Sequence, residues 1–261
     1  MWFISLAIFL LGLIVGSFLN VVIYRYNTGL SVSKGRSMCF QCGKVLHWYE
    51  LIPVISFVIQ QRRCRRCHSL ISWQYPAVEL LTGFLFLAVW QLKTESLFII
   101  PLYWLIFSTL VVILVYDLRH KIIPDGPVYL FIGLGALTTL SRSHLDIGLL
   151  GKHWLASLVF FLVFAALWYF SAGRWMGFGD AKLVTGLGFL LGISSGITAL
   201  VLAFWSGAIV GIALIVIGKI LKFSGPKINI KSEIPFAPFI IFGLALAFFT
   251  DINLLDIVTT L

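Results

Sequence analysis

The chain has 261 residues, of which 60% are hydrophobic and only 11% are charged, and its mean hydropathy is +1.03. A soluble globular domain carries about 25% charged residues, so this composition excludes an ordinary soluble protein. The formal net charge of +9 could suggest a nucleic-acid partner. The basic residues are instead distributed as in a membrane protein, and we expect no binding to nucleic acid.

The apolar residues fall in blocks of about 20, the length that an α-helix needs to cross the hydrocarbon core of a bilayer. The sequence therefore predicts an all-α polytopic membrane protein with about eight transmembrane helices. The expected spans are residues 1–24, 76–92, 96–116, 123–140, 153–172, 181–196, 197–218 and 235–255. The first span lacks the basic n-region and the cleavage site of a signal peptide, so we expect it to be retained.

The basic residues also predict how the chain is oriented in the membrane. When the 25–75 segment is placed in the cytoplasm, 16 of the 19 Lys and Arg residues lie on that side. Positive charge is retained in the cytoplasm during insertion, so this bias sets the expected orientation. The same residues would be attracted to anionic lipid headgroups.

Residues 25–75 form the only sizeable polar segment and contain all four cysteines, as "CFQC" (Cys39 and Cys42) and "CRRC" (Cys64 and Cys67). Two C-x-x-C motifs separated by 21 residues can deliver four thiolates to one tetrahedral ion, usually zinc. Two disulfides or a redox pair are the alternatives, but disulfides rarely persist in the reducing cytosol. We therefore expect a cytoplasmic zinc module at 25–75, between a first helix at 1–24 and a helical membrane domain at 76–261.

The predicted zinc ion is structural, because four protein ligands leave no open position for water. A module of about 50 residues has little hydrophobic core, and a metal ion supplies the missing stability. His47 and His68 are possible substitute ligands, although histidines beside a complete cysteine set are more often surface residues.

Two carboxylates stand at the predicted cytoplasmic edge of the membrane. Asp117 closes the third apolar span, and Asp180 opens the sixth span within "GFGDAKL". Ionisable groups at such a depth are costly and usually functional. The alternative is that each pairs with a neighbouring base, Arg119 or Lys182.

Two such carboxylates can catalyse hydrolysis if they approach each other. A close pair shares a proton, so that one member activates water while the other polarises a scissile carbonyl. Gly177 and Gly179 suit this role, because glycine allows close approach of a substrate backbone or a positive φ.

Two other acidic residues have simpler interpretations. Glu79 lies three residues after Pro76, where an acid complements a helix N-terminus; contact with a substrate or cofactor cation is the alternative. Asp125 in "IIPDGP" is expected to cap the next helix. Lys182 is most simply an anchor at the membrane interface.

Several motifs resemble those of the type IV prepilin peptidases, the bacterial leader peptidases of pilins and type II secretion pseudopilins. The resemblance runs nearly end to end. The matching stretches are "GSFLNVVIYR" (16–25), the two C-x-x-C motifs, "ELIPVISF" (50–57), "ISWQYPAVELLTG" (71–83), "YDLRHKIIPD" (116–125), "MGFGDAKL" (176–183) and "IPFAPFIIFG" (234–243).

The resemblance implies that Asp117 and Asp180 are the catalytic pair of a GxGD-type intramembrane aspartic protease and that the four cysteines bind zinc. It also implies cleavage of a prepilin after a glycine, at the cytoplasmic face of the bacterial inner membrane. Many members then methylate the new N-terminus with S-adenosylmethionine. Glu79 is a candidate for contact with that cofactor.

One position departs from the family pattern. The family usually has a glycine two residues before the third cysteine, where this chain has Arg62. A peptidase without methyltransferase activity therefore stays an alternative. No glycine-rich dinucleotide-binding motif follows a strand, so a cofactor site would have to be built between the helices and the zinc module.

Two other classes of protein are less consistent with the sequence. A transporter would place its charges within the spans and show repeated halves with broken helices. A membrane scaffold that docks partners through the zinc module would not need both aspartates. The oligomeric state and the particular substrate stay open.

Overall fold

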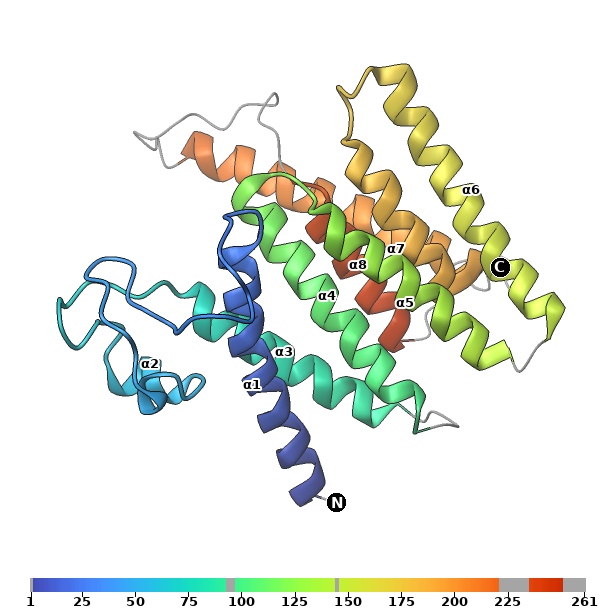
Figure 1. Cartoon of the computed structure of the whole chain (residues 1–261). Helices are drawn as coiled ribbons and strands as arrows, with labels where there is room; N and C mark the ends of the chain where they lie inside the picture. The colour runs from blue at the N-terminus through green and yellow to red at the C-terminus, as the bar shows by residue number, and fades with distance from the viewer. Residues whose placement is uncertain (1, 93–96, 144–145, 221–234, 251–261) are drawn as a thin grey trace. The chain divides into compact units, whose positions relative to one another are not determined.

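The computed structural model describes residues 2–92, 97–143, 146–220 and 235–250 (Figure 1). Within these ranges the chain is mainly helical and has no strand beyond two isolated β-bridges, which confirms the predicted all-α class. The elements are α1 (Trp2–Arg25), η1 (Trp48–Glu50), α2 (Ile55–Ile59), α3 (Gln74–Gln91), α4 (Ile99–His120), α5 (Asp125–Ser143), α6 (Ile147–Ser171), α7 (Phe178–Ile220) and α8 (Ala237–Thr250).

Four of the described helices are long and apolar enough to cross a membrane: α1, α4, α6 and residues Phe178–Ile217 of α7. Most of their exposed side chains are apolar as well. In α6, for example, Leu155, Leu158 and Leu162 follow one face and are each more than half exposed, as lipid-facing residues would be. The polytopic membrane character is thus confirmed. The predicted last span, 235–255, ends outside the described residues, and the count of eight spans stays a prediction.

The sequence predicts two spans at 181–196 and 197–218, where the structure has the single element α7 with a kink. Gly192 interrupts it with φ 72° and ψ −166°, a conformation that only glycine adopts readily. The break therefore lies at Gly192 and not after residue 196. Near the kink, the carbonyl of Phe189 accepts a hydrogen bond from Thr139 Oγ1 (2.7 Å) and lies 2.8 Å from His153 Nδ1.

The chain divides into two compact units, residues 1–112 and 113–261, and α4 begins in the first unit and ends in the second. In the first unit α1 packs against α3. A Cβ added at Gly12 or Gly16 would lie 2.7 Å from the Cα of Gly83 or of Glu79, so the two backbones touch. This is the close approach that a G-x-x-x-G pattern permits in membranes. The contact between Gly16 and the backbone of Glu79 fixes the position of Glu79 along α1.

The second unit is organised around α7, which packs against α5, α6 and α8. The side chains at these contacts are large and fully buried, for example Phe131 of α5, Leu183 and Leu187 of α7, and Ile240 and Leu244 of α8. Dense packing of this kind holds the N-terminal end of α7 in one position. That end carries Asp180.

Candidate active site and cysteine cluster

Asp117 lies in the last turn of α4, three residues before its end, and its side chain is only 4% exposed. The backbone N–H of Ala237, the first residue of α8, donates a hydrogen bond to its carboxylate. The Oδ2 atom of Asp117 is buried, and among the described residues no group donates a hydrogen bond to it. Because buried polar atoms are nearly always paired, this oxygen is positioned for a partner such as a water molecule or a proton donor.

Asp180 is the third residue of α7, and its side chain is 6% exposed. The N–H of Gly177 donates to Oδ2 of Asp180 (3.2 Å), and the N–H of Asp180 donates back to the carbonyl of Gly177 (3.1 Å). These reciprocal bonds fix the side chain at the helix N-terminus. The carboxylates of Asp117 and Asp180 are near enough to interact electrostatically. The structure thus brings together the two aspartates that the sequence singles out.

The two predicted glycines have different surroundings. A Cβ added at Gly179 would lie 2.8 Å from Cβ of Ile123, in the segment between α4 and α5. Packing against Ile123 therefore accounts for Gly179 without any substrate. At Gly177 the nearest atom would be Asp180 Oδ2 at 3.8 Å, which leaves ordinary space. Neither glycine has a positive φ, so that part of the expectation is wrong.

Lys182 does not pair with Asp180. Its Nζ atom lies 2.6 Å from Oδ1 of Asp125 and 5.2 Å from the ring centroids of Tyr129 and Phe178. Asp125 is the first residue of α5, so this ion pair links the N-terminal ends of α5 and α7. The alternative in which Lys182 neutralises Asp180 is therefore wrong.

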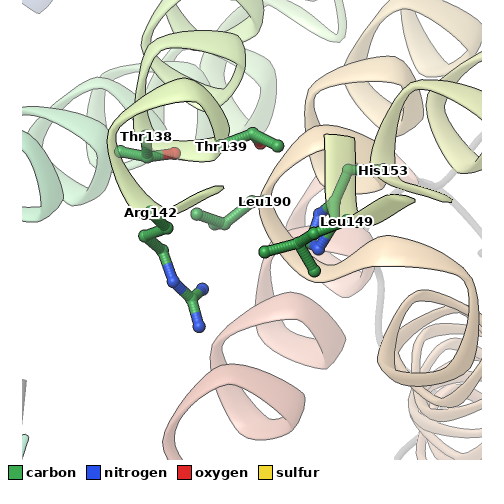
Figure 2. Close-up of a pocket in the computed structure, with 6 residues that line it drawn as sticks. All are labelled: Thr138, Thr139, Arg142, Leu149, His153 and Leu190. Atoms are coloured by element: carbon green, nitrogen blue, oxygen red, sulfur yellow. The ribbon is translucent and has the colours of Figure 1, made fainter. Parts of the chain in front are cut away.

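A small cavity of about 30 Å³ lies among α5, α6 and α7, lined by residues that include Arg142 and His153 (Figure 2). It has room for one or two water molecules. The hydroxyls of Thr138 and Thr139 donate to backbone carbonyls, and His153 Nδ1 is engaged by Phe189. In Figure 2 the guanidinium of Arg142 points away from His153. The cavity is lined by neither aspartate, and two of its lining residues, Thr139 and His153, contact the Phe189 carbonyl near the kink of α7.

The four cysteines meet as predicted. Their Sγ atoms all lie within 4.8 Å of one another, and the Sγ atoms of Cys39 and Cys67 are 3.8 Å apart. A tetrahedral ion with Zn–S bonds of 2.3 Å requires sulfur atoms about 3.8 Å apart, so this geometry suits zinc. Cys64 is buried, and all four are free thiols, so the alternative with two disulfides is wrong for this structure. Among the described residues, the group that could hold a metal ion consists of the four cysteines and does not include His47 or His68.

The two C-x-x-C motifs form matching hairpins. In each, the first cysteine donates its N–H to the carbonyl five residues later and accepts from the N–H four residues later. The residue four positions after the first cysteine has a positive φ in both hairpins: 65° at Gly43 and 56° at His68. His68 is therefore at a turn position that favours glycine, and its side chain is exposed.

The charges of the cysteines explain why a cation suits the cluster. Burial opposes ionisation of Cys39, but hydrogen bonds from the backbone amides of Cys42 and Gln41 lower its pKa to about 6. The Lys44 amide favours ionisation of Cys42, but burial and the three neighbouring cysteines raise its pKa to about 11. Four thiolates this close repel one another, and a divalent cation removes that conflict.

Arg62 has a positive φ of 62°, which gives a physical reason why glycine suits this position. Its side chain makes two contacts that glycine would lack. Arg62 Nε donates to the carbonyl of Ile71 (3.1 Å), and the guanidinium lies 5.7 Å from the ring centroid of Trp73. The arginine therefore preserves the backbone turn of the second hairpin and adds contacts to the segment that leads into α3.

Glu79 lies in α3 and is 6% exposed. Oε2 of Glu79 accepts a hydrogen bond from the N–H of Val54 (2.8 Å), and the hydroxyl of Ser17 in α1 also donates to the carboxylate. Val54 has φ 60° and ψ −50°, an unusual conformation for a β-branched residue. The carboxylate thus anchors the loop before α2. The geometry gives Glu79 this positioning role, and a cofactor contact stays a prediction.

The fold and the two clusters together define a polytopic membrane protein with a buried carboxylate pair and a four-cysteine module. Two family models match the chain: the bacterial peptidase A24 N-terminal domain over residues 10–92, and the type IV leader peptidase family over residues 104–212. The chain therefore belongs to the type IV prepilin leader peptidase family, as the sequence motifs predict.

Curated relatives named prepilin leader peptidase/N-methyltransferase agree with this assignment. The protein of Bacillus subtilis (strain 168) is 34% identical over 244 residues, which cover 92% of each chain. The protein of Legionella pneumophila is 30% identical over 96% of this chain and 93% of its own length. The protein of Myxococcus xanthus (strain DK1622) is 37% identical over 80% of this chain and 62% of its own length. No solved structure matches the chain.

Proposed function

We propose that the protein is an intramembrane aspartic endopeptidase that removes the basic leader of type IV prepilins or pseudopilins. The single observation that carries this proposal is the buried Oδ2 atom of Asp117, which no described residue donates to, while the carboxylate interacts with that of Asp180. Family membership supports the substrate class. A scaffold gives no reason for two buried carboxylates, and a transporter would place its charges within the spans, whereas Asp117 and Asp180 lie at helix ends.

In the proposed mechanism Asp117 and Asp180 share one proton, because two close carboxylates in a low dielectric do not both ionise. The ionised member takes a proton from a water molecule held at Oδ2 of Asp117. The resulting hydroxide attacks the scissile carbonyl carbon, and the protonated member donates to the carbonyl oxygen. A proton then passes to the leaving nitrogen, the C–N bond breaks, and the pair returns to its singly protonated state.

The groups around the pair have positioning roles in this proposal. The Gly177 N–H holds Asp180 in place, and the Ala237 N–H does the same for Asp117. A Cβ added at Gly177 would make only ordinary contacts, and the proposal places an extended substrate backbone beside this residue. Gly179 contributes by admitting Ile123 instead.

The four cysteines would hold one structural zinc ion, with Cys39, Cys42, Cys64 and Cys67 as ligands. The observed sulfur separations support this choice of metal. All four positions of a tetrahedral ion are then taken, so the zinc ion stabilises the 25–75 module and takes no part in hydrolysis.

A second activity, methylation of the new N-terminus with S-adenosylmethionine, is proposed from the names of the relatives. The cofactor would supply the methyl group. Glu79 is already engaged by Val54 and Ser17, so we assign no residue to the cofactor and derive no step through it. Arg62 preserves the turn that the family's glycine makes, which supports retention of this activity over a peptidase acting alone.

The proposed topology has eight spans in the bacterial cytoplasmic membrane. The two segments of α7 on either side of Gly192 would be the sixth and seventh spans. The 25–75 module and both aspartates would then lie at the cytoplasmic face, where the prepilin leader is accessible. Helix α1 ends one residue after the proposed boundary at 24/25, and α3 begins two residues before the proposed boundary at 75/76.

The experiment is to incubate the purified full chain with a candidate prepilin, with and without S-adenosylmethionine, and to analyse the product by mass spectrometry. We expect loss of the leader in both reactions and one added methyl group only with the cofactor. An intact prepilin in both reactions would refute the peptidase, and an unmodified mature N-terminus would refute the methyltransferase.

A further inference from the structure

The short helix α2 has one apolar face that no described residue covers. Ile55, Val58 and Ile59 are 55%, 65% and 66% exposed. They are spaced i, i+3 and i+4, so they share one face of the helix. On the other side, Phe57 is buried and packs against Trp73, with ring centroids 5.0 Å apart. A polar module that presents three adjacent aliphatic side chains requires an apolar partner.

The anchoring of α2 places that face at membrane depth. Val54, the residue before α2, is bound by Glu79, which lies five residues into α3, or about 7.5 Å along its axis. The same carboxylate is bound by Ser17, eight residues before the end of α1, or about 12 Å. The start of α2 is thus level with the apolar parts of α1 and α3, and not with the C-terminal end of α1 or the N-terminal end of α3. Phe18, next to Ser17, is itself 53% exposed.

The charge of the same module suits one kind of surface. Residues 25–75 contain eight Lys and Arg residues and a single acid, Glu50, which is paired with Lys44 at 2.8 Å. Arg63, Arg65 and Arg66 follow α2 closely in the chain and are exposed. Basic residues beside an inserted apolar face are the pattern of an interfacial helix that binds anionic lipid.

We propose that α2 is an interfacial membrane anchor, whose residues Ile55, Val58 and Ile59 insert into the headgroup–acyl boundary of an anionic leaflet. Arg63, Arg65 and Arg66 bind the lipid phosphates around it. The partner is the bilayer and not a second protein, because the depth set by Glu79 and Ser17 brings this face alongside the lipid-facing residues of α1. The anchor holds the cysteine module against the membrane in a fixed position.

The test is photocrosslinking of the full-length protein in vesicles of phosphatidylethanolamine and phosphatidylglycerol. Benzoylphenylalanine replaces Val58 in one variant. It replaces Leu155, a lipid-facing residue of α6, as the positive control, and Leu30, which is 62% exposed outside α2, as the matched control. Bound zinc is measured in each variant, so that only intact modules are compared.

We expect lipid adducts at positions 58 and 155, with position 30 at background. The proposal is overturned if position 155 reacts with lipid while position 58 does not, if positions 58 and 30 react equally, or if position 58 crosslinks to a second copy of the chain. Replacing phosphatidylglycerol with phosphatidylcholine should reduce the adduct at 58 and leave that at 155 unchanged. An equal yield at 58 in both lipids would overturn the role of the arginines.

Discussion

Lys182 pairs with Asp125 at 2.6 Å, although Asp180 lies only two residues before it in the chain. The ion pair therefore leaves the Asp180 carboxylate to interact with Asp117. It also connects the starts of α5 and α7. The contact between Ile123, just before α5, and Gly179, in the first turn of α7, joins the same two segments. A basic residue this close in the sequence would be expected to neutralise Asp180, and here it is paired with Asp125 instead.

The first prediction concerns the two aspartates. Asp117→Asn and Asp180→Asn should each reduce prepilin cleavage by about 10²- to 10⁴-fold, the usual contribution of a general acid or base. Cleavage is measured with a purified prepilin, and bound zinc and membrane insertion should not change. Lys182→Met is the matched variant. It removes a partly exposed ion pair that contributes about 1 kcal/mol or less, so cleavage should fall far less. Equal losses in all three variants would contradict the assignment.

The second prediction separates the two glycines. Gly179→Ala should lower thermal stability, because the new methyl group would lie 2.8 Å from Cβ of Ile123, an atom that cannot move without the backbone. Gly177→Ala meets only ordinary contacts, so its stability should stay the same. If a substrate backbone lies against Gly177, this variant should raise KM for prepilin. An unchanged KM would show that the substrate passes elsewhere.

The sequence predicts features that depend on motifs visible within the chain, and it does not predict contacts between residues far apart in the chain. The clustering of the four cysteines is confirmed, because the spacing of the two C-x-x-C motifs is visible in the chain. The position of the two aspartates at the ends of apolar blocks singles them out, but the sequence leaves their separation open. The Ala237 amide on Asp117 was not predicted, because nothing in the pattern at 234–243 indicates where its backbone donates. The packing of Gly179 against Ile123 was missed for the same reason: it depends on a segment more than 50 residues away.

The kink at Gly192 is a second case. Apolar length alone divides residues 181–218 near the middle, and it places the boundary at 196. The observed break depends on one glycine conformation and on two distant side chains, Thr139 and His153, that bind the nearby Phe189 carbonyl. The G-x-x-x-G pattern at Gly12 and Gly16 is a signal in the sequence for the α1–α3 contact, although the lengths of the apolar blocks do not indicate it.

The third prediction tests the kink. Gly192→Ala should destabilise the protein by about 1–3 kcal/mol, because its φ and ψ are accessible to glycine alone. Gly133→Ala in α5 is the control: its added Cβ meets nothing within 4 Å, so it should stabilise the helix by up to about 1 kcal/mol. Thermal unfolding in detergent distinguishes the two. A neutral effect of Gly192→Ala would mean that the α7 kink is absent in solution.

The fourth prediction compares two non-glycine residues near the second pair of cysteines that have a positive φ, Arg62 and His68. His68→Gly should stabilise the module, because a left-handed conformation costs a non-glycine residue about 1–2 kcal/mol. Arg62→Gly gains the same relief but loses the hydrogen bond to Ile71 and the contact with Trp73, so its net gain should be smaller. Thermal unfolding measures the difference. A greater gain in stability for Arg62→Gly than for His68→Gly would contradict the prediction.

The last prediction concerns the metal. Cys64 is the buried cysteine of the cluster, so Cys64→Ser should lower bound zinc below one ion per chain and loosen residues 25–75, as seen by faster proteolysis of that segment. Strong chelation of the wild type should have the same effect. His68→Gly is the control, because His68 is outside the ligand set and its loss should leave one zinc ion bound.

Acidification should release the ion, since zinc requires thiolates and protonation competes with it. Wild-type protein purified without zinc, and with residues 25–75 equally resistant to protease after chelation, would rule out the structural role of the metal.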